Sequence, residues 1–170
     1  MLNGAIEKIF TMDDIDRAIL YEIQRNSKLT NAELAAKVGL STPAVFARVK
    51  RLEDTGVICG YVALINKDVM GYEMLCFIQV SLAAHEPRIT NGFRVAVDAM
   101  PEVLECHQLI GDIDYLLKVV LMHKDDLRHF LMERLTPIPG VARVKTSLVL
   151  EEIKSTTILP VEPPPGYHEE

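Results

Sequence analysis

The first quarter of the chain carries apolar residues at the three- and four-residue spacing of amphipathic helices. Isoleucines recur at every fourth position of residues 14–25, which places them on one face of a helix. Thr30 and Glu33 have the spacing of a capping box, so a second helix should begin at Thr30 and end at Gly39. The pattern therefore predicts two short helices before residue 40.

A third helix is expected directly after the second. Ser41 is its predicted N-cap, Pro43 suits its first turn, and Gly56 ends it. Its predicted core stripe consists of Val45, Val49 and Leu52. Three short helices with a tight, glycine-containing turn between the last two indicate a helix-turn-helix. Residues 57–66 alternate loosely and predict a short β wing.

From residue 73 onward the pattern changes to apolar runs of strand length and two amphipathic helices. The order strand, helix, strand, strand, helix, strand is the ferredoxin-like pattern. The six segments are residues 73–83, 87–100, 102–110, 114–122, 124–135 and 141–153. Two helices can cover only one face of a four-stranded sheet, yet residues 115–122 are apolar on both faces. The uncovered face is therefore expected to meet another subunit.

These segments predict an α+β protein with an N-terminal winged helix-turn-helix and a C-terminal ferredoxin-like βαββαβ domain. The tail is rich in proline and acidic residues, a composition typical of disorder. The predicted division is residues 1–11 (N-terminal extension), 12–60 (helix-turn-helix), 61–71 (β linker), 72–155 (ferredoxin-like domain) and 156–170 (C-terminal strand and Pro-rich tail).

Charge is distributed unevenly along the chain. Lys and Arg number 18 and Asp and Glu 24, a net charge of −6. Residues 1–60 hold eight residues of each sign, so the whole excess lies in residues 61–170. An acidic chain is a poor non-specific ligand for polyanions. Any contact with nucleic acid must therefore come from a local basic patch in the first part.

The cysteines and the apolar runs bear on location. Cys59, Cys76 and Cys106 are scattered, odd in number and form no CxxC motif, which favours a reducing compartment. No run reaches the ~18 apolar residues needed to span a bilayer. Residues 1–14 lack the uninterrupted apolar core of a secretory signal. We therefore expect a cytoplasmic protein with no membrane partner.

The third helix carries a candidate nucleic-acid-reading face. The candidates are Ser41, Thr42, Ala44, Ala47, Arg48, Lys50 and Arg51. The two alanines and two arginines fall within about 100° of one another around the helix axis, and the lysine lies on the flank. Small alanines let a helix approach DNA closely, basic side chains contact phosphates or guanine, and a helix N-terminus suits a phosphate. The alternative is a solvated face on which Arg48 or Arg51 pairs with an acid of a neighbouring helix.

Three segments of the chain carry distinctive motifs: LSTPAVFARVKRLEDTGVICGYVALIN, VLECHQLIGDIDYLLKVV and IPGVARVKTSLVLEEIK. Together they resemble the Lrp/AsnC family of prokaryotic regulators, most closely its leucine-responsive members. The likeness covers roughly residues 12–160 and includes two unrelated motif blocks in the family's order. It implies a helix-turn-helix regulator in which residues 72–155 bind an effector and oligomerise.

The resemblance implies a transcription regulator that binds specific sequences of double-stranded DNA. Its DNA binding or its assembly would respond to an amino acid. Family members dimerise by packing two sheets face to face, dimers often join into octamers, and amino acids bind in clefts between dimers. The Gly-Asp-x-Asp-Tyr loop lines that cleft, and part of the last strand is tied to effector response. The matching residues are Gly111, Asp112, Asp114, Tyr115, Ser147, Leu148 and Val149. Such a regulator would be cytoplasmic and nucleoid-associated.

Other interpretations of the same residues are possible. Asp112 and Asp114 lie beside a glycine where a turn between strands favours aspartate, and we expect no catalytic pair there. The histidines and cysteines lack the spacing of a metal site, so neither a metal nor a cofactor is predicted. Sirohaem decarboxylases resemble this architecture, but the basic third helix favours DNA binding over an enzyme. An architectural DNA-wrapping protein with little effector control would use the same modules.

Overall fold

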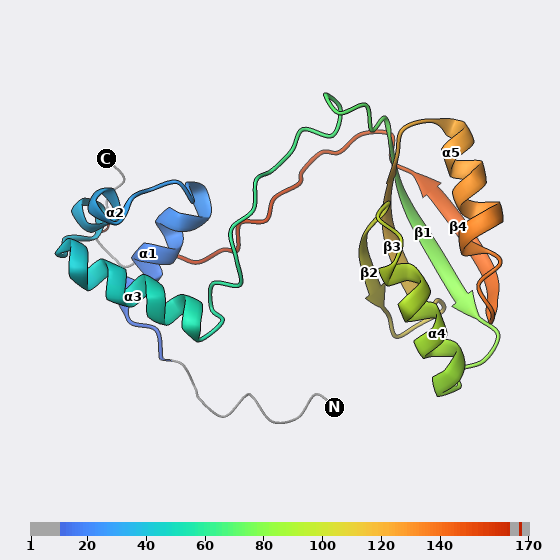
Figure 1. Ribbon diagram of the computed structural model, residues 1–170, viewed down its shortest axis with the longest axis horizontal. Coiled ribbons are helices and arrows are strands. Elements are labelled where there is room, and N and C mark those ends of the chain that lie inside the picture. Colours follow the sequence, from blue (N-terminus) through green and yellow to red (C-terminus); the bar gives the residue numbers. More distant parts are fainter. Residues whose placement is uncertain (1–10, 164–166, 168–170) are drawn as a thin grey trace. The chain divides into compact units, whose positions relative to one another are not determined.

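The computed structural model describes residues 11–163 and Tyr167, and its chain forms two compact units (Figure 1). Of the described residues, one unit holds 11–63 together with 155–163 and Tyr167, and the other holds 64–154. The C-terminal segment therefore returns to the N-terminal unit. The predicted N-terminal extension lies outside the described residues except for Thr11.

The N-terminal unit contains three short helices, as predicted. They are α1 (Asp14–Arg25), α2 (Asn31–Val38) and α3 (Thr42–Asp54). The first two each begin at a capping box, formed by Asp13 with Asp16 and by Thr30 with Glu33. Gly39 ends α2 at φ 68°, in the left-handed region that favours glycine. This turn leads the chain into α3 and completes the helix-turn-helix.

Apolar side chains from all three helices form the core of this unit. The buried ones are Ile19, Leu20, Leu34, Ala35, Val45 and Leu52. Ile15, Ile23 and Val49 are partly buried and pack against this core. The predicted stripes therefore face inward, since a helix with one apolar side must bury that side against another element.

The predicted β wing and β linker are wrong in their secondary structure. Residues 57–66 contain no strand, and residues 67–71 form a turn. Val57 and Ile58 instead pack against the helical core, while Val62 and Leu64 are exposed. A strand needs a neighbouring strand to hydrogen-bond its backbone, and this segment pairs with no strand in the described part of the chain.

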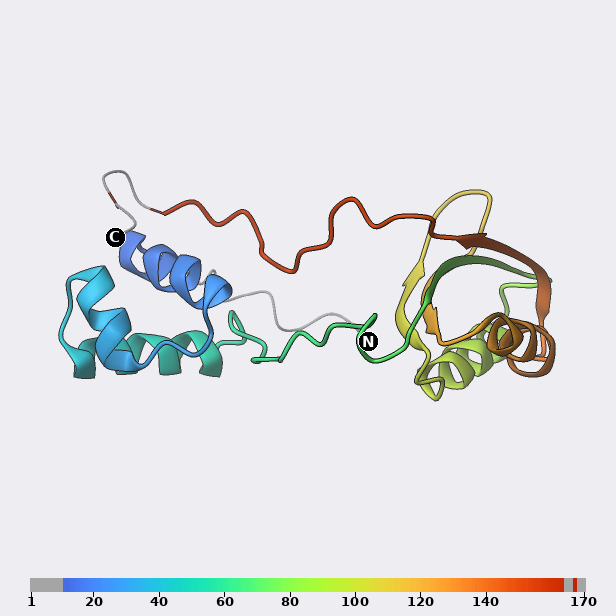
Figure 2. The ribbon, with the colours of Figure 1, turned by 90° about the horizontal axis from the view of Figure 1, so that it is seen from above.

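The second unit is an antiparallel sheet with helices on one face (Figures 1 and 2). Its elements are β1 (Met74–Leu82), α4 (Pro87–Asp98), β2 (Val103–Gln108), β3 (Tyr115–Leu121), α5 (Lys124–His129), the π-helix η1 (Phe130–Leu135) and β4 (Val141–Leu148). The strand order β2-β3-β1-β4 is the predicted ferredoxin-like topology. Ile78, Phe93, Leu117 and Phe130 belong to the core between sheet and helices.

The uncovered face of the sheet is only partly apolar. Leu75 and Val120 are buried on it, and Phe77 is 37% exposed. Lys118 pairs with Phe77 in the β1–β3 register, and its ammonium lies 3.1 Å from the Glu105 carboxylate on β2. The expectation of an apolar second face therefore holds only for part of the sheet. Contact of this face with another subunit stays a prediction.

The described part of the C-terminal segment, residues 156–163 and Tyr167, contains no strand, contrary to the prediction, and contacts α1. The Gln24 side chain donates to the Leu159 carbonyl at 3.4 Å and accepts from the Leu159 amide at 2.7 Å. Val161 packs against the helical core, and the Tyr167 hydroxyl donates to Glu22 at 2.7 Å. Proline and acidic content favour disorder, but these apolar and aromatic side chains give the segment specific contacts.

Candidate nucleic-acid interface and effector loop

Helix α3 has one solvent-exposed side opposite the side that packs into the core. Val45 and Leu52 are fully buried, which fixes the rotation of the helix. The exposed residues from its N-cap to its end are Ser41, Thr42, Pro43, Phe46, Ala47, Lys50, Arg51, Glu53 and Asp54. Ala47 and Lys50 thus face solvent, whereas Ala44 is half-buried and lies nearer the core.

The first turn of α3 lacks a side-chain cap. Ser41 occupies the N-cap position with an extended backbone, but its hydroxyl makes no capping hydrogen bond. Both Ser41 and Thr42 are exposed. The first amides of a helix have no intrahelical acceptor, so this turn keeps N–H groups that can donate to a phosphate.

Arg48 and Arg51 reach back toward α1. Arg48 Nη1 lies 2.7 Å from an Asp13 oxygen and 2.8 Å from an Asp16 oxygen, and Arg51 Nη2 lies 2.5 Å from Asp16. The Asp16 side chain is 0% exposed, so a lone charge there would be costly. Both arginines therefore adopt the alternative arrangement, in which each forms an ion pair with an acid near the start of α1. Their contact with DNA stays a prediction.

This cluster changes the titration of its members. A hydrogen bond from the Asp16 amide, and then the Arg48 guanidinium, hold the pKa of the Asp13 carboxyl below its usual value. The hydrogen bonds to Asp13 and Asp16 raise the pKa of Arg48. Asp13 and Arg48 are therefore both charged at neutral pH and hold the start of α1 against α3.

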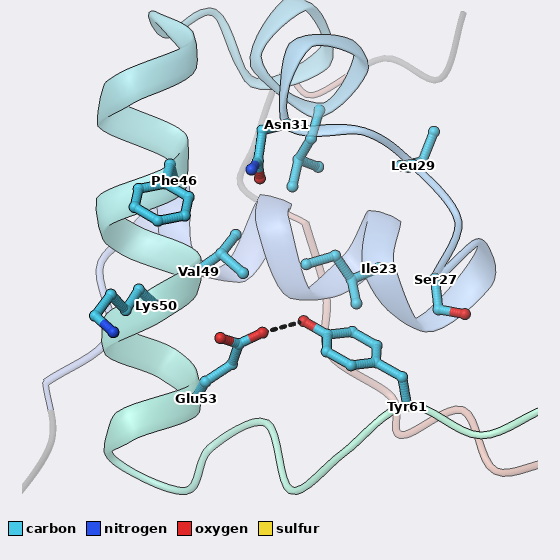
Figure 3. Close-up of a pocket in the computed structure, with 10 residues that line it drawn as sticks. Ile23, Ser27, Leu29, Asn31, Phe46, Val49, Lys50, Glu53 and Tyr61 are labelled. Carbon is cyan, nitrogen blue, oxygen red and sulfur yellow. Dashed lines mark hydrogen bonds between the residues drawn. The ribbon is translucent and has the colours of Figure 1, made fainter.

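Phe46 is a candidate that the sequence analysis missed. Its side chain is 55% exposed in the middle of α3. It follows Thr42 and precedes Lys50 by four residues each, so all three lie on neighbouring positions of the exposed side. This four-residue spacing is the sequence pattern from which Phe46 could have been predicted to lie on the exposed side. Phe46 also borders a pocket of about 330 Å³ against Ile23, Leu29 and Val49 (Figure 3).

Tyr61 borders the same pocket and holds the segment after α3 against the helix (Figure 3). Its hydroxyl donates to the Glu53 carboxylate at 2.8 Å. Partial burial, and then the hydrogen bond to Glu53, raise the pKa of Tyr61 to about 12. The phenol therefore remains protonated and keeps donating this bond at physiological pH.

Asp114 immediately precedes β3 and is held by β1 and the segment after β1. Its carboxylate accepts from the Leu82 amide at 2.7 Å and lies 2.5 Å from His85 Nε2. The hydrogen bond from His85, and then that from the Leu82 amide, lower the pKa of Asp114. This carboxylate therefore already has partners that fasten the β2–β3 connection to the end of β1.

The remaining residues of the predicted effector loop differ in exposure. Gly111 and Asp112 are exposed in the connection between β2 and β3, beside the fully exposed Ile110. Tyr115 is buried under α4, where its ring packs on Phe93 with centroids 4.5 Å apart. The loop thus presents backbone and a carboxylate to solvent and buries its tyrosine.

The two parts of the predicted effector set lie far apart in one chain. Tyr115 pairs with Val80 near one end of β1, whereas Ser147 pairs with Phe77 on the other side of that strand. Leu148 and Val149 continue toward the opposite end, where the Val149 amide donates to Leu75. Strand geometry puts Tyr115 and Ser147 about 10 Å apart along the sheet and about 10 Å across it. A single chain therefore does not gather the seven residues.

Neither a metal-binding cluster nor a membrane-spanning helix is present among the described residues. No group of three or more His, Cys, Asp and Glu side chains there has the geometry to hold a metal ion. Within the same part of the chain, no helix has both the length and the hydropathy for a membrane span.

The sequence matches two domain families along most of its length. Residues 12–58 match the winged helix-turn-helix DNA-binding family, and residues 75–159 match the Lrp/AsnC ligand binding domain. The leucine-responsive regulatory protein of Haemophilus influenzae is 41% identical over 148 residues, covering 87% of this chain and 89% of that protein. The leucine-responsive regulatory protein of Escherichia coli K12 is 38% identical, covering 89% and 92% respectively.

Solved structures of similar fold point the same way. A transcriptional regulator of Neisseria meningitidis, solved as a complex with L-Met, has a TM-score of 0.85 at 37% identity and covers 88% of this chain and 97% of its own. AsnC of E. coli has a TM-score of 0.81 at 26% identity and covers 88% and 99%. The relatives are regulators, which sets aside the decarboxylase alternative. The chain is a DNA-binding transcription regulator and belongs to the Lrp/AsnC family.

Proposed function

We propose that the exposed side of α3 enters the major groove of double-stranded DNA. The observation that carries this proposal is the row of small, apolar and basic side chains on that side: Pro43, Phe46, Ala47 and Lys50. Ala47 permits a close approach, Lys50 contacts a phosphate or guanine, and Ser41 and Thr42 receive a phosphate at the helix start. Arg48 and Arg51 orient α3 on α1 through their ion pairs with Asp13 and Asp16.

The charge distribution supports local, site-specific contact over general adhesion. The helix-turn-helix unit is close to neutral and the rest of the chain is acidic. Affinity must then come from a few well-placed groups, because the whole chain repels the DNA backbone. This also favours a sequence-specific regulator over an architectural wrapping protein, whose binding needs extensive phosphate neutralisation.

The proposed effector is an amino acid, since the Neisseria relative was solved with L-Met. The loop at Gly111 and Asp112 offers backbone amides and a carboxylate for its charged ends. Ser147, Leu148 and Val149 would come from a second copy, because one chain holds them far from the loop. The proposed site therefore requires self-association, to dimers and then to octamers.

Lys50→Glu tests the DNA-binding surface, with Lys154→Glu as the matched control. Both lysines are exposed, and only Lys50 lies on α3. Fluorescence anisotropy on an operator selected from random DNA should show at least about a tenfold loss for Lys50→Glu. Lys154→Glu should bind almost as the wild type does. Equal affinity of both variants would remove α3 from the interface.

Light scattering tests the effector and assembly. The proposal expects an oligomer larger than a dimer whose mass or DNA affinity changes with L-methionine or L-leucine. A monomer in solution, or indifference to every common amino acid, would contradict it and favour the architectural alternative. A cytoplasmic, nucleoid-associated location is the corresponding prediction in the cell, checked by co-localisation of a fluorescent fusion with DNA.

A further inference from the structure

Two segments of the chain connect the helical unit to the sheet unit (Figure 2). Residues 62–73 lead from the helical unit to β1, and residues 150–158 lead from the end of β4 back to the helical unit. The second segment continues into a C-terminal strap, which consists of residues 159–163 and Tyr167 in the described part of the chain. The helical unit is therefore attached to the sheet unit at two points.

Specific contacts hold the strap on α1. The Gln24 side chain accepts from the Leu159 amide at 2.7 Å and donates to the Leu159 carbonyl at 3.4 Å. The buried Glu22 carboxylate accepts from the Tyr167 hydroxyl at 2.7 Å with one oxygen, and its other oxygen lies 3.2 Å from the Lys37 ammonium. Because a buried carboxylate is costly without partners, the strap completes the surroundings of Glu22.

The segment that leads to the strap has fixed ends and an irregular middle. Residues 150–158 contain no helix or strand, and Leu150 and Ile153 are largely exposed. At one end the Val149 amide donates to a β1 carbonyl, and at the other end Leu159 is bonded to α1. The backbone from Val149 to Leu159 spans at most about 35 Å. The second connection therefore has a limited reach.

The two connections join the helical unit at different helices. The first leaves beside the end of α3, where the Tyr61 hydroxyl donates to Glu53. The second ends on α1, at Gln24. A body held at one point turns freely about that point, whereas a body held at two points turns only about the line between them. The strap therefore removes orientations of α3 that a single connection would allow.

A single connection would let α3 adapt to operators of different geometry. A flexible chain as long as residues 62–73 has a root-mean-square end-to-end distance of about 20 Å. Half a turn of DNA is about 17 Å long. The first connection by itself would therefore accommodate a half-site displaced by half a turn.

We infer that the strap restricts the spacing of the two DNA half-sites that a pair of copies can bind. With the strap in place, α3 reaches only a narrow range of positions, and half-sites at other spacings are bound at the cost of the strap contacts. This inference rests on the proposed contact of α3 with DNA and on self-association. It assigns operator specificity to Gln24, Val161 and Tyr167, which lie on α1 and the strap rather than on α3.

An insertion tests the connection without removing any contact of the strap. About six Gly and Ser residues placed after Glu152 lengthen the second connection by up to about 20 Å, more than half a turn of DNA. The control carries the same residues after Glu170, outside the connection. Fluorescence anisotropy compares the selected operator with one whose half-sites lie about five base pairs further apart. Wild type and control should lose at least about tenfold in affinity, and the insertion variant at most about threefold.

A second variant releases the strap in the full chain. Gln24→Ala combined with Val161→Asp removes the bonds to Leu159 and places a charge against the helical core. It should tolerate the added base pairs as the insertion variant does. Hydrogen exchange of the α1 amides should be faster in this variant and unchanged in the insertion variant. Equal tolerance in both would thus assign the effect to the connection and not to stability.

The outcomes distinguish this inference from the proposed function. An insertion variant that loses as much affinity as the wild type overturns the role of the strap and leaves the DNA surface standing. A wild type that tolerates the added base pairs also overturns it, because no restriction then exists. Weaker binding of the insertion variant to a duplex with one half-site overturns it too, since the connection would then affect α3 itself. A wild type that stays monomeric overturns both proposals.

Discussion

Arg48 Nη1 lies 2.8 Å from the Asp16 carboxylate, a buried charge that links α3 to α1. Arg51 approaches the same carboxylate at 2.5 Å. The two arginines that look most suited to DNA therefore also hold the helix-turn-helix together. Reversing Arg51 to Glu would place a negative charge against a buried carboxylate, so lost DNA binding in that variant would not identify a DNA contact.

Asp16→Asn should destabilise the helical unit by about 2–3 kcal/mol. This is below the range for fully buried ion pairs, because both guanidiniums reach solvent. Hydrogen exchange of the α1 and α3 amides measures the local unfolding free energy. Asp14→Asn is the control, since Asp14 is exposed in the same turn. Equal protection in both variants would show that the Asp16 ion pairs contribute nothing measurable.

Phe46 should recognise a thymine methyl group, the apolar feature of the major groove. Replacing the contacted thymine by uracil removes that methyl and should cost the wild type about three- to fivefold in affinity. Phe46→Ala should bind the thymine and uracil operators equally. Lys50→Ala should keep the preference for thymine but show a weaker dependence on salt. A wild type that is indifferent to uracil at every operator position would refute this role.

A chain ending at Thr157 should lose stability in the helical unit alone. It lacks the Leu159 bonds to Gln24, the packing of Val161 and the Tyr167 contact with Glu22. The loss should be about 1–3 kcal/mol in the α1 amides and near zero in β1, measured by hydrogen exchange. A chain ending at Pro163, which keeps all but the tyrosine, should show a smaller loss. Equal protection of the α1 amides from hydrogen exchange in the full-length chain and both shortened chains would contradict a structural role for this segment.

Asp114→Asn should lower stability at neutral pH, with an effect that fades in acid. The folded-state pKa of Asp114 lies below its ordinary value of 3.8, so its ionised form stabilises the fold above that value. This contribution is lost as the pH falls through the lowered pKa. Urea unfolding should show a deficit of about 1–2 kcal/mol at neutral pH and little difference once the pH lies below the lowered pKa. Asp112→Asn should change little, and a deficit independent of pH would exclude the charge as the cause.

Local sequence patterns were sufficient to predict most of the helices and strands and their order along the chain. The Thr30–Glu33 capping box, the Gly39 turn and the apolar periods predict the helices, and the sequence of periods predicts the βαββαβ topology. The same reasoning failed for residues 57–66, since apolar alternation cannot report whether a partner strand exists. It also failed for the tail, because composition does not report that Leu159 and Val161 find a surface on α1.

The sequence by itself determined the family and the order of a helix-turn-helix followed by an α+β domain, because these follow from spacings within a few residues. Only the tertiary structure decided what each candidate side chain contacts. In the structure, Arg48 and Arg51 form ion pairs with Asp16, and Asp114 is hydrogen-bonded to His85. Tyr115 and Ser147 lie apart, on strands that flank opposite sides of β1. Partners distant in sequence depend on helix rotation and strand register, which many weak contacts fix together.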